Sequence, residues 1–133
     1  MVLPVSLILF ALAAACNAVM DTLVHHHNTS VFKHHAKGFW SDAYLQSWKN
    51  KYIDGDPEKG RKKIFGNINY PVQLTDAWHF FKTILIFLIV FAIVFYKPMF
   101  TWWIEIIVFG VVWNCTFSLF YKKLFIQPKK SEK

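Results

Sequence analysis

Polar and ionisable residues recur at helical spacing inside stretches of the sequence that are otherwise apolar. Asn17, Asp21, His25 and Asn28 follow one another at steps of four, four and three residues. An α-helix turns by about 100° per residue, so these steps place the four side chains on one face. Because ionisable groups in a bilayer are costly and usually face a bundle interior or water, this face is a candidate functional surface.

Two further stripes with three- and four-residue steps occur later in the chain. They consist of Asp76, His79 and Thr83, and of Asn114, Ser118 and Tyr121. If the apolar stretches cross a membrane in turn, all three stripes lie in the same half of the bilayer or at its edge. We therefore expect the helices to bring these polar groups to a similar depth.

Two kinds of site are compatible with these residues. Asp21 with His25, and Asp76 with His79, would supply two carboxylates and two imidazoles, which suit zinc or another divalent transition metal. Such a metal could activate water for hydrolysis near lipid head groups, and without it the same groups could relay protons or hold a cation. Alternatively, the polar groups hydrogen-bond across helices and fix their packing. That network would add Asn17, Asn28, Thr83, Asn114 and Ser118.

Glu105 is a further ionisable residue, about one turn inside the last apolar stretch. The other apolar stretches offer it no obvious charged partner. It would be protonated there, reach back to Lys97, or mark a contact with another subunit. The sequence leaves these alternatives open.

The elements that must position these residues are three predicted membrane-spanning helices. Of the 133 residues, 55% are hydrophobic and 19% aromatic. A helix that crosses the hydrocarbon needs about 20 mostly apolar residues. Such stretches cover residues 2–24, 80–96 and 99–121. We predict an all-α integral membrane protein in which residues 1–133 form a single membrane domain.

The ends of these spans have their own signals. Thr75 is predicted to cap the second helix, with Asp76 in its first turn. Lys97 and Pro98 predict a tight connection, because proline ends one helix and readily starts the next. The first span lacks a basic residue before its apolar run and continues past Cys16, so we expect it to be retained, with cleavage at Cys16 as the alternative.

The net charge of +7 is concentrated outside the spans. The loop 28–78 carries seven lysines and one arginine against five acidic residues, and the tail 122–133 carries five lysines against one glutamate. This pattern predicts a cell (inner) membrane protein with its N-terminus outside and its loop and tail in the cytoplasm, where they attract anionic lipids. Charge at the ends of spans argues against a nucleic-acid partner.

The loop is rich in aromatic residues interleaved with lysines. The apolar positions are near-helically spaced and comprise Phe39, Trp40, Tyr44, Leu45, Trp48 and Tyr52. This pattern predicts a short helix that lies in the membrane interface. A short helix packed on the cytoplasmic ends of the spans explains the pattern equally well.

Two blocks of the sequence resemble a known group of proteins. The blocks are W-K-N-K-Y, at 48–52, and L-T-D-A-W-H, at 74–79. They are similar to blocks in short, uncharacterised membrane proteins of Bacteroidetes-type bacteria and their phages. The resemblance covers about the middle half of the chain and the Asn17–Asp21 end of the first span, and it implies a prokaryotic or phage origin but no activity.

Two functional hypotheses follow from the sequence. The first is a non-enzymatic membrane module that assembles with copies of itself or with another membrane protein, through Glu105 and the aromatic loop. The second is a membrane-embedded metal-dependent enzyme or cation site built from Asp21, His25, Asp76 and His79.

Overall fold

The computed structural model describes residues 4–35, 38–40 and 47–127. Within these residues the protein is mostly helical, and three helices are long and apolar enough to cross a membrane. They are α1 (Val5–His25), α2 (Ala77–Val94) and α3 (Trp102–Ser118), which continues as the π-helical turn η7 (Leu119–Phe125). The predicted fold class is confirmed, and the helices are consistent with a multi-pass membrane protein.

Two helix starts differ from the predictions. The cap of α2 is Asp76 rather than Thr75, because Asp76 has extended backbone (φ −158°) and its side chain accepts a hydrogen bond from His79 N. Thr75 instead has helical backbone at the end of the preceding turn. Pro98 does not start the third span, since α3 begins at Trp102 after an irregular connection.

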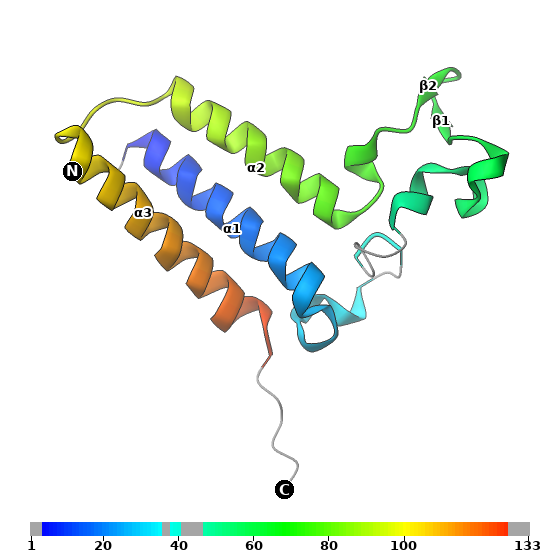
Figure 1. Ribbon diagram of the computed structural model, residues 1–133, viewed down its shortest axis with the longest axis horizontal. Coiled ribbons are helices and arrows are strands. Elements are labelled where there is room, and N and C mark those ends of the chain that lie inside the picture. The colour runs from blue at the N-terminus through cyan, green and yellow to red at the C-terminus, as the bar shows by residue number, and fades with distance from the viewer. Residues whose placement is uncertain (1–3, 36–37, 41–46, 128–133) are drawn as a thin grey trace, which may run out of the picture.

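Figure 1 shows α1 lying between α2 and α3, with α2 running in the opposite direction. The buried side of α1 is lined by small side chains, among them Ala13, Ala14, Cys16 and Ala18. Small residues let neighbouring helices approach closely, which explains why α1 occupies the centre. In contrast, most side chains of α2 and α3 are exposed or half-buried.

The start of the loop and the end of η7 meet in an aromatic cluster at one end of the helices. Phe32 is buried, stacks on Trp40 at a ring distance of 5.1 Å and contacts Phe125 at 5.2 Å. Trp40 also contacts Phe81 of α2, at 6.0 Å. For this part of the loop, packing on the ends of the helices is therefore observed. Tyr44 and Leu45, which belong to the predicted interfacial helix, lie outside the described residues.

The rest of the loop consists of short elements. The helical turns are of 3₁₀ type and comprise η1 (His27–Thr29), η2 (Val31–His34), η3 (Ser47–Lys51), η4 (Ile53–Gly55), η5 (Pro57–Lys59) and η6 (Val72–Leu74). Strands β1 (Lys63–Ile64) and β2 (Ile68–Asn69) form an antiparallel hairpin, with Lys63 opposite Asn69. The all-α prediction did not include this hairpin.

Candidate functional site

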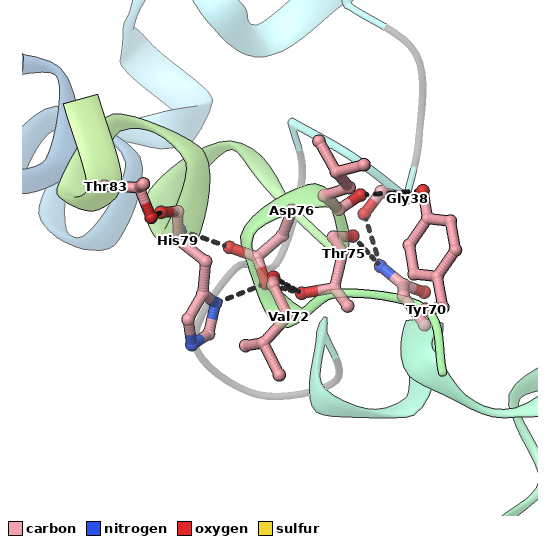
Figure 2. Close-up of polar contacts among 9 residues, drawn as sticks. Gly38, Tyr70, Val72, Thr75, Asp76, His79 and Thr83 are labelled. Carbon is pink, nitrogen blue, oxygen red and sulfur yellow. Dashed lines mark hydrogen bonds and ion pairs between the residues drawn. The ribbon is translucent and has the colours of Figure 1, made fainter. Parts of the chain in front are cut away.

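A polar site lies where the loop enters α2, and it consists of Thr75, Asp76 and His79 (Figure 2). We call it the junction site. The Asp76 carboxylate is fully buried and accepts a hydrogen bond from His79 N at 2.9 Å. The Thr75 hydroxyl lies 3.0 Å from Asp76 Oδ2 and 2.7 Å from the Val72 carbonyl oxygen. Asp76 therefore satisfies a backbone donor at the start of α2, as an N-cap does.

The imidazole of His79 is paired with the same carboxylate. His79 Nδ1 lies 2.7 Å from Asp76 Oδ2, and the His79 side chain is 34% exposed whereas that of Asp76 is 0% exposed. A carboxylate accepts hydrogen bonds, so it favours the tautomer with hydrogen on Nδ1 and a lone pair on Nε2. The outer nitrogen of His79, Nε2, then carries a lone pair at the start of α2, where it can accept a hydrogen bond or bind a cation.

Residues from the middle of the loop hold the junction site in place. Asn50 Nδ2 donates to the carbonyl oxygens of Gly38, at 2.8 Å, and Thr75, at 3.0 Å. Ala77 N donates to the Phe39 carbonyl oxygen at 2.8 Å. The W-K-N-K-Y block, which contains Asn50, thus meets the L-T-D-A-W-H block. Sequence reasoning did not single out Asn50, because no local spacing connects positions 25 residues apart.

Asp21 and His25 do not join Asp76 and His79 in one group. Asp21 is half-buried and His25 is exposed at the end of α1. Across residues 4–35, 38–40 and 47–127, no three His, Cys, Asp or Glu side chains lie close enough to hold a metal ion. Of the four residues expected to bind zinc or a similar metal, the structure brings together Asp76 and His79.

The polar network expected between the spans also takes a different form. Thr83 Oγ1 donates to the His79 carbonyl oxygen at 2.9 Å, and Asn114 Nδ2 donates to that of Gly110 at 2.8 Å. Asn28 Oδ1 lies 3.5 Å from Nδ1 of its neighbour His27. These contacts are local, within one helix or turn. Among the described residues, no hydrogen bond of Asn17, Asn28, Thr83, Asn114 or Ser118 connects two of the spans.

Glu105 has partners that the sequence did not indicate. It is 5% exposed, at the start of α3. The Tyr96 hydroxyl donates to its Oε2. The backbone N–H groups of Met99 and Phe100 donate to its Oε1, the second at 3.1 Å. Glu105 therefore closes the connection between α2 and α3, and this explains why α3 begins at Trp102 rather than at Met99.

The outer side of α3 carries an exposed stripe, which we call the α3 stripe: Trp103, Ile107, Gly110 and Asn114. Its steps of four, three and four residues place all four on one face of the helix. All four are exposed. A different side of α3, about 100° round the helix, meets α1, where Phe109 and Trp113 contact Phe10 at 5.1 Å each. The α3 stripe therefore points away from the rest of the described chain.

Three comparisons with known proteins give no further guide to the site. No family model, no curated protein and no solved structure matches this chain.

Proposed function

We propose that this chain is a small non-enzymatic membrane module that assembles with a second copy of itself through the α3 stripe. The supporting observation is the position of Asn114. Its side chain is exposed on the outer side of α3, near the middle of the span Trp102–Phe125. Hydrocarbon cannot satisfy the hydrogen-bonding groups of a carboxamide, whereas a neighbouring helix can.

The orientation of the chain makes a second copy the natural partner. Three crossings would put the basic loop and tail on the same side of the membrane, and their positive charge favours the cytoplasm for that side, with the N-terminus outside. All copies then insert in the same direction, so equal residues of two copies lie at the same depth. A two-fold axis along the membrane normal would bring the two α3 stripes face to face.

The chemistry of the α3 stripe suits such a pairing. One N–H of the Asn114 amide donates to Gly110 O. The second N–H and the oxygen remain, so two Asn114 side chains can each donate to the other. At Gly110, no side chain or other segment of the described chain lies within 4 Å of where a Cβ would stand, apart from its chain neighbours and the local backbone of α3, so a partner helix can approach closely. Trp103 and Ile107 continue the face with the three- and four-residue steps typical of paired helices.

Oxidative cross-linking of the full chain in membranes tests this proposal. A cysteine replaces Ile107, on the α3 stripe, or its neighbour Ile106, in a chain that carries Cys115→Ala and keeps Cys16, which is buried in α1. Both isoleucines are exposed, at 56% and 65%, but they point about 100° apart. We expect a disulfide-linked dimer with Ile107→Cys and little with Ile106→Cys. Equal cross-linking at the two positions, or none at either, would contradict the proposal.

Two substitutions on the stripe separate assembly from folding. Gly110→Leu adds a side chain that meets open space within one chain, so the monomer should fold normally while the dimer is lost. Asn114→Leu should weaken dimerisation about tenfold, and Asn114→Gln, which keeps the carboxamide, should restore much of it. Dimer affinity is measured by energy transfer between labelled chains diluted in lipid. Unchanged affinity in Gly110→Leu would exclude the stripe as the interface.

A second candidate function is proton or cation handling at the junction site. The contact that favours it is the 2.7 Å pairing of His79 Nδ1 with buried Asp76. Elemental mass spectrometry of the purified chain, with His79→Ala and Asp21→Asn as variants, tests the metal form of this function. About one metal per chain that is lost in both variants would contradict the separation of Asp21 from the junction site seen among the described residues. Loss in His79→Ala alone would restrict the site to the junction.

A further inference from the structure

The tip of the β1–β2 hairpin carries a large apolar side chain that is almost entirely open. Phe65 is 91% exposed, and Ile68, which pairs with Ile64 next to the turn, is 60% exposed. Phe65 also has a φ of 49°, in the left-handed region, and Gly66 follows it with a φ of 85°. Turns of this shape favour glycine or asparagine, so forming the hairpin does not require an aromatic residue at Phe65.

Basic residues stand directly beside this apolar tip. Arg61, Lys62 and Lys63 precede it and are all exposed. The sequence has no acidic residue from Arg61 to Thr75. An apolar side chain flanked by positive charges matches a surface with negative head groups above an apolar layer. An acidic protein would complement the charges but would not by itself account for the exposed ring.

The hairpin is held near the end of a membrane span. Its base is fixed by hydrogen bonds from Lys62 N to Lys51 O, at 2.9 Å, and from Tyr70 N to Lys62 O, at 2.7 Å. Figure 1 shows it standing apart from α1, α2 and α3. The chain from Asn69 to the first residue of α2, Ala77, can span at most about 28 Å when fully extended. A bilayer that contains α2 is therefore within reach of the hairpin.

We infer that the β1–β2 hairpin is a membrane-surface anchor, with Phe65 entering the head-group region of an anionic leaflet and Arg61, Lys62 and Lys63 lying above it. This inference does not depend on assembly through α3. Neither the positions of the three spans nor the junction site requires the hairpin to bind the membrane surface.

A fluorescent probe on the full chain in lipid nanodiscs tests the inference. Asn67→Cys, in a chain with Cys115→Ala, places an environment-sensitive nitrobenzoxadiazole label beside Phe65 without replacing it, while Cys16 is buried in α1. The label is compared in discs of phosphatidylcholine alone and in discs that also contain phosphatidylglycerol. We expect a blue shift and a loss of iodide quenching in the anionic discs. Glu58→Cys, exposed elsewhere in the loop, is the matched control and should stay quenched in both.

Two sets of substitutions test the apolar and the electrostatic contributions to the anchor separately. Phe65→Ser should abolish the blue shift, and so should the combined change Arg61→Gln, Lys62→Gln and Lys63→Gln. Added salt should weaken the effect, since it screens exposed charges. The inference is overturned if the probe at position 67 stays as quenched as the probe at position 58 in anionic discs. It is also overturned if protection appears only when a soluble acidic protein is added.

Discussion

Asp76 and Glu105 are both buried carboxylates at the start of a span, and they stand at opposite ends of the bundle. Glu105 accepts from two backbone N–H groups and from the Tyr96 hydroxyl, all within the connection from α2 to α3. Asp76 accepts from one backbone N–H group and from the Thr75 hydroxyl, and it also contacts the ring of His79. The difference lies in the partners: Glu105 binds groups with structural roles, whereas Asp76 orients a side chain that can exchange protons.

The two carboxylates also differ in how easily water reaches their surroundings. Asp76 lies on the loop side, where His79 is partly exposed. Glu105 lies in a short turn between two apolar helices, beside a cavity of about 560 Å³ that is lined by Ile93, Trp102 and Ile106 among others. A backbone N–H group that loses its acceptor can form a hydrogen bond with water more readily at the first site than at the second. We therefore expect the largest stability effects at Glu105.

Glu105→Ala is expected to have the largest effect, a loss of about 3 kcal/mol in the free energy of unfolding. The change leaves the N–H groups of Met99 and Phe100 without an acceptor. Denaturation by sodium dodecyl sulfate in bicelles measures the loss. Glu105→Gln keeps an acceptor oxygen and should cost about 1 kcal/mol. Equal losses in the two variants would mean that the carboxyl group's hydrogen bonds do not hold the turn.

Asp76→Ala should follow, with a loss of about 2 kcal/mol from the missing helix cap and its charge-assisted hydrogen bond. Asp76→Asn, the control, retains an acceptor for His79 N and should lose about half as much. The same denaturation assay measures both variants. A smaller loss in Asp76→Ala than in Asp76→Asn would show that capping is not the main role of this carboxylate.

Tyr96→Phe removes the hydroxyl that donates to Glu105 and should cost about 1 kcal/mol. Tyr70→Phe is its counterpart at the loop end, where the hydroxyl donates to Leu74 O at 3.1 Å in an exposed position. Water can replace that bond, so a loss below about 0.5 kcal/mol is expected. If Tyr70→Phe proves the more damaging of the two, the contrast in water access between the two ends is wrong.

His79→Gln should have the smallest effect on stability, about 0.5 kcal/mol, because the side chain is partly exposed and water can take its place. A ¹H–¹⁵N spectrum of the imidazole ring nitrogens should lose the resonance of His79, the ring that carries hydrogen on Nδ1. A loss of stability as large as that of Asp76→Ala would instead make His79 a structural partner, and it would weaken the case for proton handling at the junction site.

Several expectations from the sequence agree with the structure because they depend on local properties. The three spans follow from runs of apolar residues whose length matches a bilayer. The second apolar run, predicted at 80–96, corresponds to α2 (Ala77–Val94). The steps between Asp76 and His79 place them within one turn of a helix, and the observed pair has this spacing. Such short-range contacts depend on helix geometry alone.

Contacts between distant segments were decided only by the tertiary structure. Asn50 reaches Thr75 across 25 positions, and Phe32 stacks on Trp40 at the end of the bundle. The polar residues within α1, α2 and α3 have the predicted periodicity, but Asn28 lies in η1, beyond the end of α1 at His25. Asn114 points outward because the contacts of Phe109 and Trp113 with Phe10 turn a different side of α3 towards α1. Periodicity defines a face of a helix, but the packing of its neighbours determines where that face points.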